Sequence, residues 1–385
     1  MTENKKLRVM FVVQSLIMGG AERMVLEISN ELISRKSADV IIVGLGSRND
    51  YPELSKNVRF VHAEIIYELS VFGKHRIDVG QLNTIINNFK PDIIHSNCYL
   101  QEAPVREYIC KSVAYFSHLH DNMPAFRKLK ITELLNKRRI TEYFEKKRLI
   151  KKYKECNNTF IAISNDTFDY FRNNLPGSWR QKIILLPNAI DFKKFYNNRP
   201  KNIDSSGTIK LINIGHFAPK KNQIFLLRVV KILRQKNINI SLKLVGDSEA
   251  VKPIFIKEAE SMGVKDCIEM PGIVNNVEDH LKQADIYVHS AIYEPFGLVL
   301  LEAMAAGLPV VCLDAGGNRD VIRNGENGFI INGEDAEKYA DSILRLINDE
   351  GLYSEMSRFA IEFAKRFDIK IYVDRLLELY NSKLQ

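Results

Sequence analysis

Residues 208–217 read TIKLINIGHF, a short unbroken β-rich run that ends close to a glycine and precedes a helical pattern, QIFLLRVVKILRQK, over residues 223–236. The alternation continues through SLKLVGD, CIEMPGIV, DIYVHS and PVVCLDAG. Short hydrophobic strands separated by amphipathic helices predict a parallel sheet that is covered on both faces. We therefore expect a doubly wound α/β domain over residues 208–365.

The N-terminal half carries an equivalent series, LRVMFVV, DVIIVGLG, VRFVHA, PDIIHSN, AYFSHLH and TFIAIS, interrupted by helical patterns. A chain of 385 residues exceeds the size at which one hydrophobic core keeps growing. We expect two Rossmann-like domains that face each other across a cleft, the first over residues 1–190. Residues 191–207, rich in Asn, Pro, Ser and Gly, read as a linker, and residues 366–385 as a C-terminal helix that crosses back to the first domain.

The composition is that of a globular protein, with 45% hydrophobic and 26% charged residues. No run of 18 or more apolar residues and no secretory cleavage pattern occur, so we expect neither a transmembrane span nor a signal peptide. The cysteines are odd in number, scattered and never spaced as C-x-x-C, which predicts free thiols in a reducing, cytoplasmic compartment. They are Cys98, Cys110, Cys156, Cys267 and Cys312.

The net charge of +8 is concentrated in one segment, because residues 127–154 contain twelve Lys or Arg against three Glu, a net +9. Apolar residues are interleaved with these cations, so the segment predicts a basic amphipathic surface that binds anionic lipid at the inner face of the plasma membrane. A solvated helix face is the alternative, and nucleic acid is a competing partner that we do not expect. The cations expected to face the membrane are Arg127, Lys128, Lys130, Lys137, Arg138 and Arg139.

Residues 294–307, EPFGLVLLEAMAAG, place two carboxylates around a run without other charges. A helix that is apolar on all sides is buried, so Glu302 needs a partner, either a protein cation or donor or the hydroxyls of a ligand. Glu294 precedes the start of this helix. Its carboxylate can accept from hydroxyls while the N–H groups of Phe296, Gly297 and Leu298 point at the same ligand.

Other polar or glycine residues also follow predicted strands, where ligands bind in parallel α/β sheets. Gly19 and Gly20 follow the first strand and allow close backbone approach, although a plain tight turn would use them too. Lys220 and Lys221 follow TIKLINIGHF at the start of a helix, where their positive charges could bind a phosphate. The alternative is that the two lysines lie in an ordinary solvated loop.

One histidine, His120, ends a predicted strand and is expected at the cleft. We expect His118 to point to the opposite side of that strand, and the remaining histidines to be core or surface residues. No pair shows metal-ligand spacing, and the chain lacks an Asp-x-Asp motif, so we expect no metal.

Taken together, GGAE at 19–22, His120, LPNAID at 186–191, IGHFAPKKN at 214–222 and the spaced glutamates with EAMAAGLPVV resemble glycosyltransferase family 4. The resemblance covers nearly the whole chain, and the spaced glutamates are its most specific part. It implies the GT-B fold and transfer of a sugar from a UDP- or GDP-sugar with retention of anomeric configuration and without a metal or other cofactor.

The resemblance also implies roles for individual residues. Glu294 would hold hydroxyls of the donor sugar, Glu302 would bind the ribose, and Lys221 would neutralise the diphosphate. The catalytic residues would be Glu294, His120 and Lys221. The donor site would comprise Gly19, Gly20, His216, Lys220, Lys221, Gly272, Ile273, Val274, Glu294, Phe296, Gly297, Leu298 and Glu302.

One departure from the family is His216, which stands where an arginine is common. Arginine is permanently charged whereas histidine is mostly neutral at pH 7, so Lys220 would have to compensate.

The function we expect is transfer to a lipid-linked saccharide acceptor in the synthesis of a capsular polysaccharide, an exopolysaccharide or another cell-surface glycan. Two alternatives stay open at this point. One is a nucleotide-sugar epimerase on the same fold, and the other is a non-catalytic protein that binds sugar nucleotides.

Overall fold

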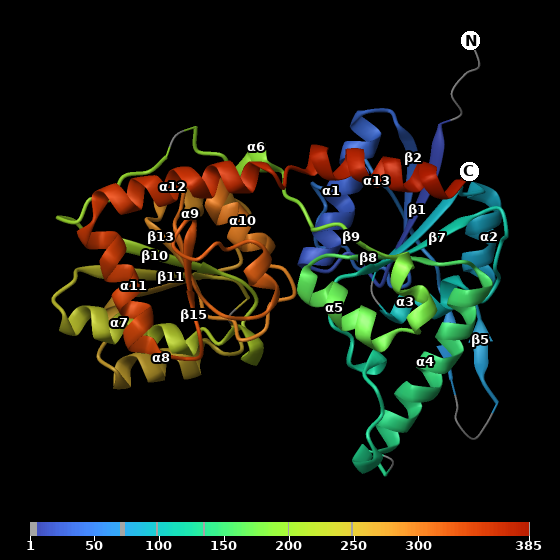
Figure 1. The fold of residues 1–385 in the computed structure, drawn as a ribbon, viewed down its shortest axis with the longest axis horizontal. Coiled ribbons are helices and arrows are strands. Elements are labelled where there is room, and N and C mark those ends of the chain that lie inside the picture. The colour runs from blue at the N-terminus through green and yellow to red at the C-terminus, as the bar shows by residue number, and fades with distance from the viewer. Residues whose placement is uncertain are drawn as a thin grey trace. The chain divides into compact units, whose positions relative to one another are not determined.

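A computed structural model describes residues 6–69, 74–97, 99–133, 135–198, 200–247 and 249–384 (Figure 1). Cys98 lies outside the described residues. Contacts within the chain define two compact units. One consists of the residues up to Asn188 together with those from Ile369 onward, and the other of Ala189–Asp368.

The first unit is built on a seven-stranded parallel sheet with the order β3-β2-β1-β6-β7-β8-β9. Residues 9–13 of the central strand β1 are buried, which explains why its sequence is apolar without alternation. The strands are β1 (Leu7–Val13), β2 (Ala38–Gly44), β3 (Arg59–His62), β6 (Ile93–Asn97), β7 (Ala114–Leu119), β8 (Thr159–Ala162) and β9 (Ile183–Leu185). The predicted Rossmann-like sheet is thus present.

Helices surround this sheet, and β4 (Ile66–Glu68) and β5 (Arg76–Asp78) form a separate antiparallel hairpin. The α-helices are α1 (Gly20–Ser34), α2 (Gly80–Phe89), α3 (Tyr99–Val105), α4 (Lys137–Glu155), α5 (Asn165–Asn174) and α13 (Ile369–Leu384). Short 3-10 turns cover Pro124–Phe126, Ile131–Glu133 and Gly177–Lys182. No helix among residues 6–384, as far as they are described, is long and apolar enough to cross a membrane.

The second unit contains a six-stranded parallel sheet with the order β12-β11-β10-β13-β14-β15. Its strands are β10 (Ile209–Ile214), β11 (Ile240–Val245), β12 (Ile268–Gly272), β13 (Ile286–His289), β14 (Val310–Leu313) and β15 (Gly328–Ile331). Its helices are α6 (Phe192–Phe195), α7 (Ile224–Gln235), α8 (Lys252–Ser261), α9 (Val277–Gln283), α10 (Leu298–Ala305), α11 (Ala336–Asn348) and α12 (Glu350–Lys365). Both sheets are therefore of the doubly wound type predicted from the sequence.

The stretch 191–207, which we expected to be a linker, belongs to the second unit. It contains the short helix α6, and its side chains Phe192, Phe195 and Ile203 are buried. The stretch is mostly polar, so its sequence did not indicate that these three apolar side chains pack into the second unit.

The C-terminal helix α13 packs on the first unit, beside α1 and near β7 (Figure 1). The Tyr380 hydroxyl lies 2.5 Å from Nδ1 of His95 in β6, and the Tyr372 hydroxyl lies 3.4 Å from Nε2 of His118 in β7. All four side chains are at least 97% buried. Two tyrosine hydroxyls thus satisfy buried imidazole nitrogens that would otherwise destabilise the sheet.

We predict that Tyr380→Phe lowers the free energy of unfolding of the first unit by about 1–3 kcal/mol, because a buried nitrogen of His95 loses its partner. Urea unfolding can be followed by the fluorescence of Trp179, the single tryptophan, which is 7% exposed in this unit. Tyr108→Phe is the control, since Tyr108 is 66% exposed. Equal effects of the two variants would contradict the assigned contribution of the hydrogen bond.

Candidate functional site

The predicted ligand residues of the second unit lie at one edge of its sheet, the edge formed by the carboxyl ends of the strands. Gly272 ends β12 with a φ of 80°, and its carbonyl accepts from the N–H of Gly246, just beyond β11, at 2.9 Å. A Cβ on Gly246 would come within 2.0 Å of the carbonyl oxygen of Gly215, which follows β10. Glycine backbones therefore line this part of the edge, where Ile273 is 51% exposed and Val274 is half-buried.

His216 and Lys220 follow β10 and are both exposed at the same edge. The His216 carbonyl accepts from the Gln223 side chain at 3.2 Å, which fixes the loop to the start of α7. The Lys220 ammonium lies 5.5 Å from the ring centroid of Tyr293, and the N–H of Ile292 donates to the Lys220 carbonyl at 2.9 Å. The loop after β10 is thereby joined to the loop after β13.

The centre of the site is the carboxylate of Glu294, which is 9% exposed. Its Oε2 lies 2.5 Å from Nζ of Lys221 and 3.4 Å from Nε2 of His289, the last residue of β13. The Ser290 hydroxyl donates to the Lys221 carbonyl at 2.9 Å, so the backbone of the lysine is held as well. Two nitrogen atoms from different strand ends thus lie near one carboxylate oxygen, Lys221 as its hydrogen-bond donor and His289 at the longer distance.

These contacts determine the protonation states. Burial by itself would raise the pKa of Glu294, but His289 and the Lys221 charge lower the pKa to about 2. Burial lowers the pKa of His289, against the opposing effect of Glu294. At pH 7 the cluster therefore contains an ionised carboxylate, an ammonium and a neutral imidazole.

The backbone around Glu294 is fixed by the loop after β14. The N–H of Glu294 donates to the Ala315 carbonyl, and the N–H of Gly317 donates to the Glu294 carbonyl, both at 2.9 Å. A Cβ on Gly317 would come within 2.0 Å of the Pro295 carbonyl oxygen, so only glycine permits this approach. The carboxylate thus projects from a rigid turn.

The helix α10 begins immediately after this turn. Gly297 precedes it with a φ of 97°, a value in the left-handed region that favours glycine. Phe296 is buried and Leu298 is half-buried. The first N–H groups of a helix lack intrahelical partners, so the start of α10 offers donors next to the Glu294 carboxylate.

Glu302 lies within α10 and is 1% exposed. The prediction that this helix is buried holds from Leu300 onward, where Leu300, Leu301, Ala303, Met304 and Ala305 are fully buried, whereas Leu298 and Val299 in its first turn are half-buried. The assignment of Glu302 to a ribose stays a prediction.

In the first unit, Gly19 and Gly20 follow β1 as expected, and Gly20 begins α1. The N–H of Gly19 donates to the Tyr51 hydroxyl at 2.9 Å, and that hydroxyl lies 2.9 Å from the Gly19 carbonyl oxygen. The φ of Gly19 is −164°, which is extended backbone open to any residue. Gly20 is exposed, so its backbone is accessible to a ligand.

His120 follows β7 directly and is 9% exposed. Its Nε2 lies 3.1 Å from Oδ1 of Asn97 at the end of β6, and burial lowers the pKa of His120 to about 3. The expectation that His118 points to the opposite side is wrong. Residues two positions apart share a face of a strand, and the ring centroids of His118 and His120 are 4.0 Å apart.

Sequence reasoning missed His289, which we expected to be an ordinary core or surface residue. It also missed Gly246 and Gly317, whose close backbone contacts shape the site. The signal was available in HSAIYEPFG, because His289 ends a predicted strand and precedes Glu294 by a short loop. Among the residues that the structure describes, no group of three His, Cys, Asp or Glu could hold a metal ion.

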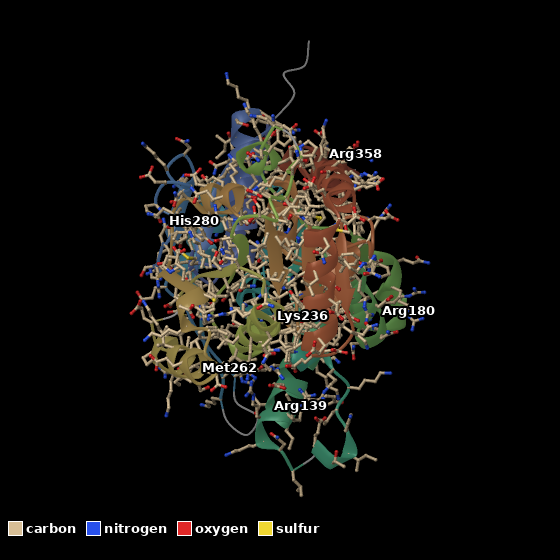
Figure 2. The ribbon with its side chains drawn as sticks, turned by 90° about the vertical axis from the view of Figure 1, so that its left-hand side faces the viewer. Arg139, Arg180, Lys236, Met262, His280 and Arg358 are labelled. Atoms are coloured by element: carbon tan, nitrogen blue, oxygen red, sulfur yellow. The ribbon has the colours of Figure 1, made fainter. Side chains whose placement is uncertain are left out.

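The basic segment forms a separate surface in the first unit, on α4 and the preceding turns. Arg127, Lys128, Lys130, Lys137 and Arg138 are exposed, whereas the Arg139 side chain is 11% exposed. Figure 2 labels Arg139 and shows the side chains of the surrounding segment extending outward.

Several of these cations have intramolecular partners. Arg127 pairs with Glu133, and Arg138 and Arg139 both pair with Glu142. The structure therefore brings the six predicted cations onto one surface but gives three of them carboxylate neighbours.

Comparisons with known proteins agree with the fold of the two units. The family model "Glycosyltransferase Family 4" matches residues 18–194, and "Glycosyl transferases group 1" matches residues 195–363. The solved structure of HepE from Anabaena in complex with UDP and glucose has a TM-score of 0.76 and 18% identity, covering 98% of this chain and 100% of that one. The fold is therefore GT-B.

Curated relatives have low identity and match only part of their length. UDP-Gal:alpha-D-GlcNAc-diphosphoundecaprenol alpha-1,3-galactosyltransferase of Escherichia coli is 24% identical over 52% of this chain and 54% of its own. The lipopolysaccharide core biosynthesis glycosyltransferase LpsE of Rhizobium meliloti is 27% identical over 56% of this chain and 66% of its own. The chain thus spans about half the length of the first of these relatives.

The two matched models and the two parallel sheets define a glycosyltransferase of the GT-B class. Within that class, the chain belongs to the family 4 type.

We predict that Glu294→Gln destabilises the protein in a pH-dependent way. The pKa of Glu294 is about 2 in the folded state and 4.5 without the fold, so the ionised carboxylate stabilises the native state above pH 5 by on the order of 3 kcal/mol. This contribution is lost as the pH falls from about 5 towards 2. The difference in free energy of unfolding between wild type and variant should therefore shrink between pH 7 and pH 3.

Urea unfolding followed by circular dichroism measures this difference. Glu334→Gln serves as an exposed control, since the Glu334 side chain is 47% exposed. A difference between wild type and Glu294→Gln that is constant across this range would contradict the assigned ion pair.

Proposed function

We propose that this protein is a retaining glycosyltransferase that moves a sugar from a UDP- or GDP-sugar to a lipid-linked saccharide acceptor in the synthesis of a capsular polysaccharide, an exopolysaccharide or another cell-surface glycan. The observation that carries the proposal is the buried, ionised Glu294, held by Lys221 and His289 at the start of α10. A carboxylate, an ammonium and free helix N–H groups at one sheet edge suit a ligand that combines sugar hydroxyls with a diphosphate.

In this proposal the Glu294 carboxylate accepts hydrogen bonds from hydroxyls of the donor sugar. An ammonium has three N–H donors, so Lys221 can keep its contact with Glu294 and also bind the diphosphate. As the bond to the anomeric carbon breaks, negative charge grows on the leaving diphosphate. Lys221 and the N–H groups of Phe296, Gly297 and Leu298 stabilise that charge, and Lys220 supplies the cation that His216 lacks.

The remaining predicted residues have supporting roles in the same proposal. Glu302 binds the ribose, and the backbone of Gly272, Ile273 and Val274 binds the base. In the first unit, His120 contacts the transferred sugar, and Gly19 and Gly20 adjoin the donor phosphate. No step requires a metal.

The proposed acceptor and location rest on the relatives and on the basic segment. The name of the Escherichia coli relative specifies a diphosphoundecaprenol-linked acceptor. Exposed apolar side chains, Ile131, Leu135 and Phe144, accompany the cations in the basic segment of this chain. Such a surface suits a protein that acts on lipid-linked substrates at the inner face of the plasma membrane.

We predict that the purified protein releases UDP or GDP from a sugar nucleotide when a polyprenyl-diphosphate saccharide is present. Glu294→Gln should lower the rate roughly 100-fold or more, because the sugar loses a charged acceptor and Lys221 loses its counter-ion. A thermal-shift screen of nucleotide diphosphates and their sugars selects the donor beforehand.

The control is Glu334→Gln, which should keep the wild-type rate. Absence of nucleotide release with every donor would contradict the proposed transfer. Nucleotide release without an acceptor would favour an epimerase, and binding without any product would favour a non-catalytic protein.

We predict that the protein floats with vesicles containing phosphatidylglycerol at low salt and is released at high salt. Each cation near an anionic surface contributes about 1 kcal/mol, and salt screens that attraction. Neutral phosphatidylcholine vesicles are the control. Failure to float with anionic vesicles at low salt would contradict membrane association.

A further inference from the structure

An open cavity of about 470 Å³ lies in the first unit, between the end of β7 and the start of α4. None of the residues expected to bind the donor lines it. Three of its lining residues are arginines. The lining comprises Asn122, Pro124, Arg127, Asn136, Arg138, Arg139, Glu142 and Tyr170.

The guanidinium groups of this cavity have two glutamate partners. Arg127 pairs with Glu133, while Arg138 and Arg139 share Glu142, with Nε of Arg138 at 3.0 Å from Oε1. Nε of Arg139 is buried, and the nearest carboxylate oxygen, that of Glu133, is 3.5 Å away. The three arginine forks therefore keep at least one N–H donor, the buried Nε of Arg139, without a hydrogen-bond partner.

The surroundings of the cavity are also positively charged. Lys128, Lys130 and Lys137 are exposed close by in the sequence. Burial lowers the pKa of Lys146, and the charges of Arg139 and Lys128 lower it further. An anion bound in the cavity would relieve this repulsion, and guanidinium forks match the oxygens of phosphate groups.

Two exposed apolar side chains accompany the arginines. Ile131 is 87% exposed and Leu135 is 99% exposed, and both stand in the turns between Arg127 and Arg138. Isolated exposed apolar residues are common, but these two stand in the short segment that links the cavity residues Arg127 and Asn136. A ligand with a phosphate head and a hydrocarbon tail satisfies both features.

We propose that this arginine cavity binds the diphosphate of the lipid that carries the acceptor saccharide, with Ile131 and Leu135 in contact with the hydrocarbon chain. The inference rests on the proposed function for the identity of the lipid. A diphosphate spreads its charge over two groups and engages several guanidinium forks, whereas a phosphodiester lipid has one charge. The cavity is a discrete site, distinct from the diffuse attraction of the basic segment to an anionic surface.

The place of the cavity in the fold fits this role. Asn122 lines it and stands two residues after His120, the residue expected to contact the transferred sugar. The Asn122 side chain donates to the Asp166 carboxylate at 2.6 Å, which fixes the loop after β7 to α5. A lipid diphosphate in the cavity would therefore place its attached saccharide next to the end of β7.

The test compares two double variants with the same loss of charge. Arg127→Gln with Arg138→Gln removes two cavity cations that are 48% and 87% exposed, and leaves Arg139 to pair with Glu133 and Glu142. Lys151→Gln with Lys154→Gln removes two exposed cations of α4 that lie outside the cavity. Thermal melting of both double variants is measured first, and both should keep the wild-type melting temperature within a few degrees.

Binding is measured by flotation with phosphatidylcholine vesicles that contain a small fraction of undecaprenyl diphosphate, without donor and without turnover. We expect saturable binding that inorganic pyrophosphate inhibits. The arginine variant should bind at least about tenfold more weakly, and the lysine variant no more than about threefold, because charge-assisted hydrogen bonds contribute about 1.5–3 kcal/mol each. With phosphatidylglycerol vesicles the two variants should lose binding equally.

Equal losses with undecaprenyl diphosphate would mean that charge alone attracts the protein and would overturn the proposal. Equal affinity of the wild type for both vesicle types, or no binding above plain phosphatidylcholine, would overturn it too. Because no sugar is transferred in the assay, a protein that binds the diphosphate lipid but releases no nucleotide would refute the proposed function alone.

Discussion

Parallel strand direction is the constraint on which both units depend. When all strands of a sheet run the same way, every chain segment that leaves a strand end emerges at the same edge. In the second unit this brings Gly272, Gly246, His216 and Glu294 together from four different strands. In the first unit it brings Asn97 and His120 within 3.1 Å of each other. The sheets thus determine which residues can meet before any side-chain contact forms.

The buried carboxylate of Glu294 needs nearby groups that compensate for the loss of water, and the edge of the second sheet supplies them. Burial disfavours a carboxylate, and the shift of its pKa in the opposite direction shows that Lys221 and His289 more than offset the loss of water. Lys221 and His289 come from different strand ends, and Gly317 holds the turn that carries Glu294. A site with this arrangement carries its charges already oriented, so little reorganisation is needed when a charged ligand enters.

Much of this arrangement could be predicted from the sequence, since the long apolar strands and the buried helix around Glu302 have clear patterns. Other features could not. β9 and the two strands of the hairpin, β4 and β5, are only three residues long, too short for a periodic signal. Residues 191–207 look polar, although three buried apolar side chains fix them to the second unit.

The residues missed at the site were missed for physical reasons as well. The position of His289 at the end of a predicted strand places it near the site, but the sequence does not show whether its imidazole fills the core or faces a carboxylate. The close approach of Gly317 to Pro295 depends on two separate loops, and the cavity at Arg127, Arg138 and Arg139 also needs Tyr170 from α5. Local pattern determines strands and helices, whereas these contacts arise only from the tertiary fold.

The histidines of the first unit constrain how the proposed transfer can work. His95, His118 and His120 are buried close together, and burial lowers the pKa of all three, so they are neutral at pH 7. Tyr372 and Tyr380 of α13 contact two of these rings with uncharged hydroxyls. His120 can therefore donate or accept a hydrogen bond, but it cannot supply positive charge to a leaving diphosphate. That charge has to come from lysines such as Lys221, which makes the second unit the electrostatic part of the proposed mechanism and the first unit its positioning part.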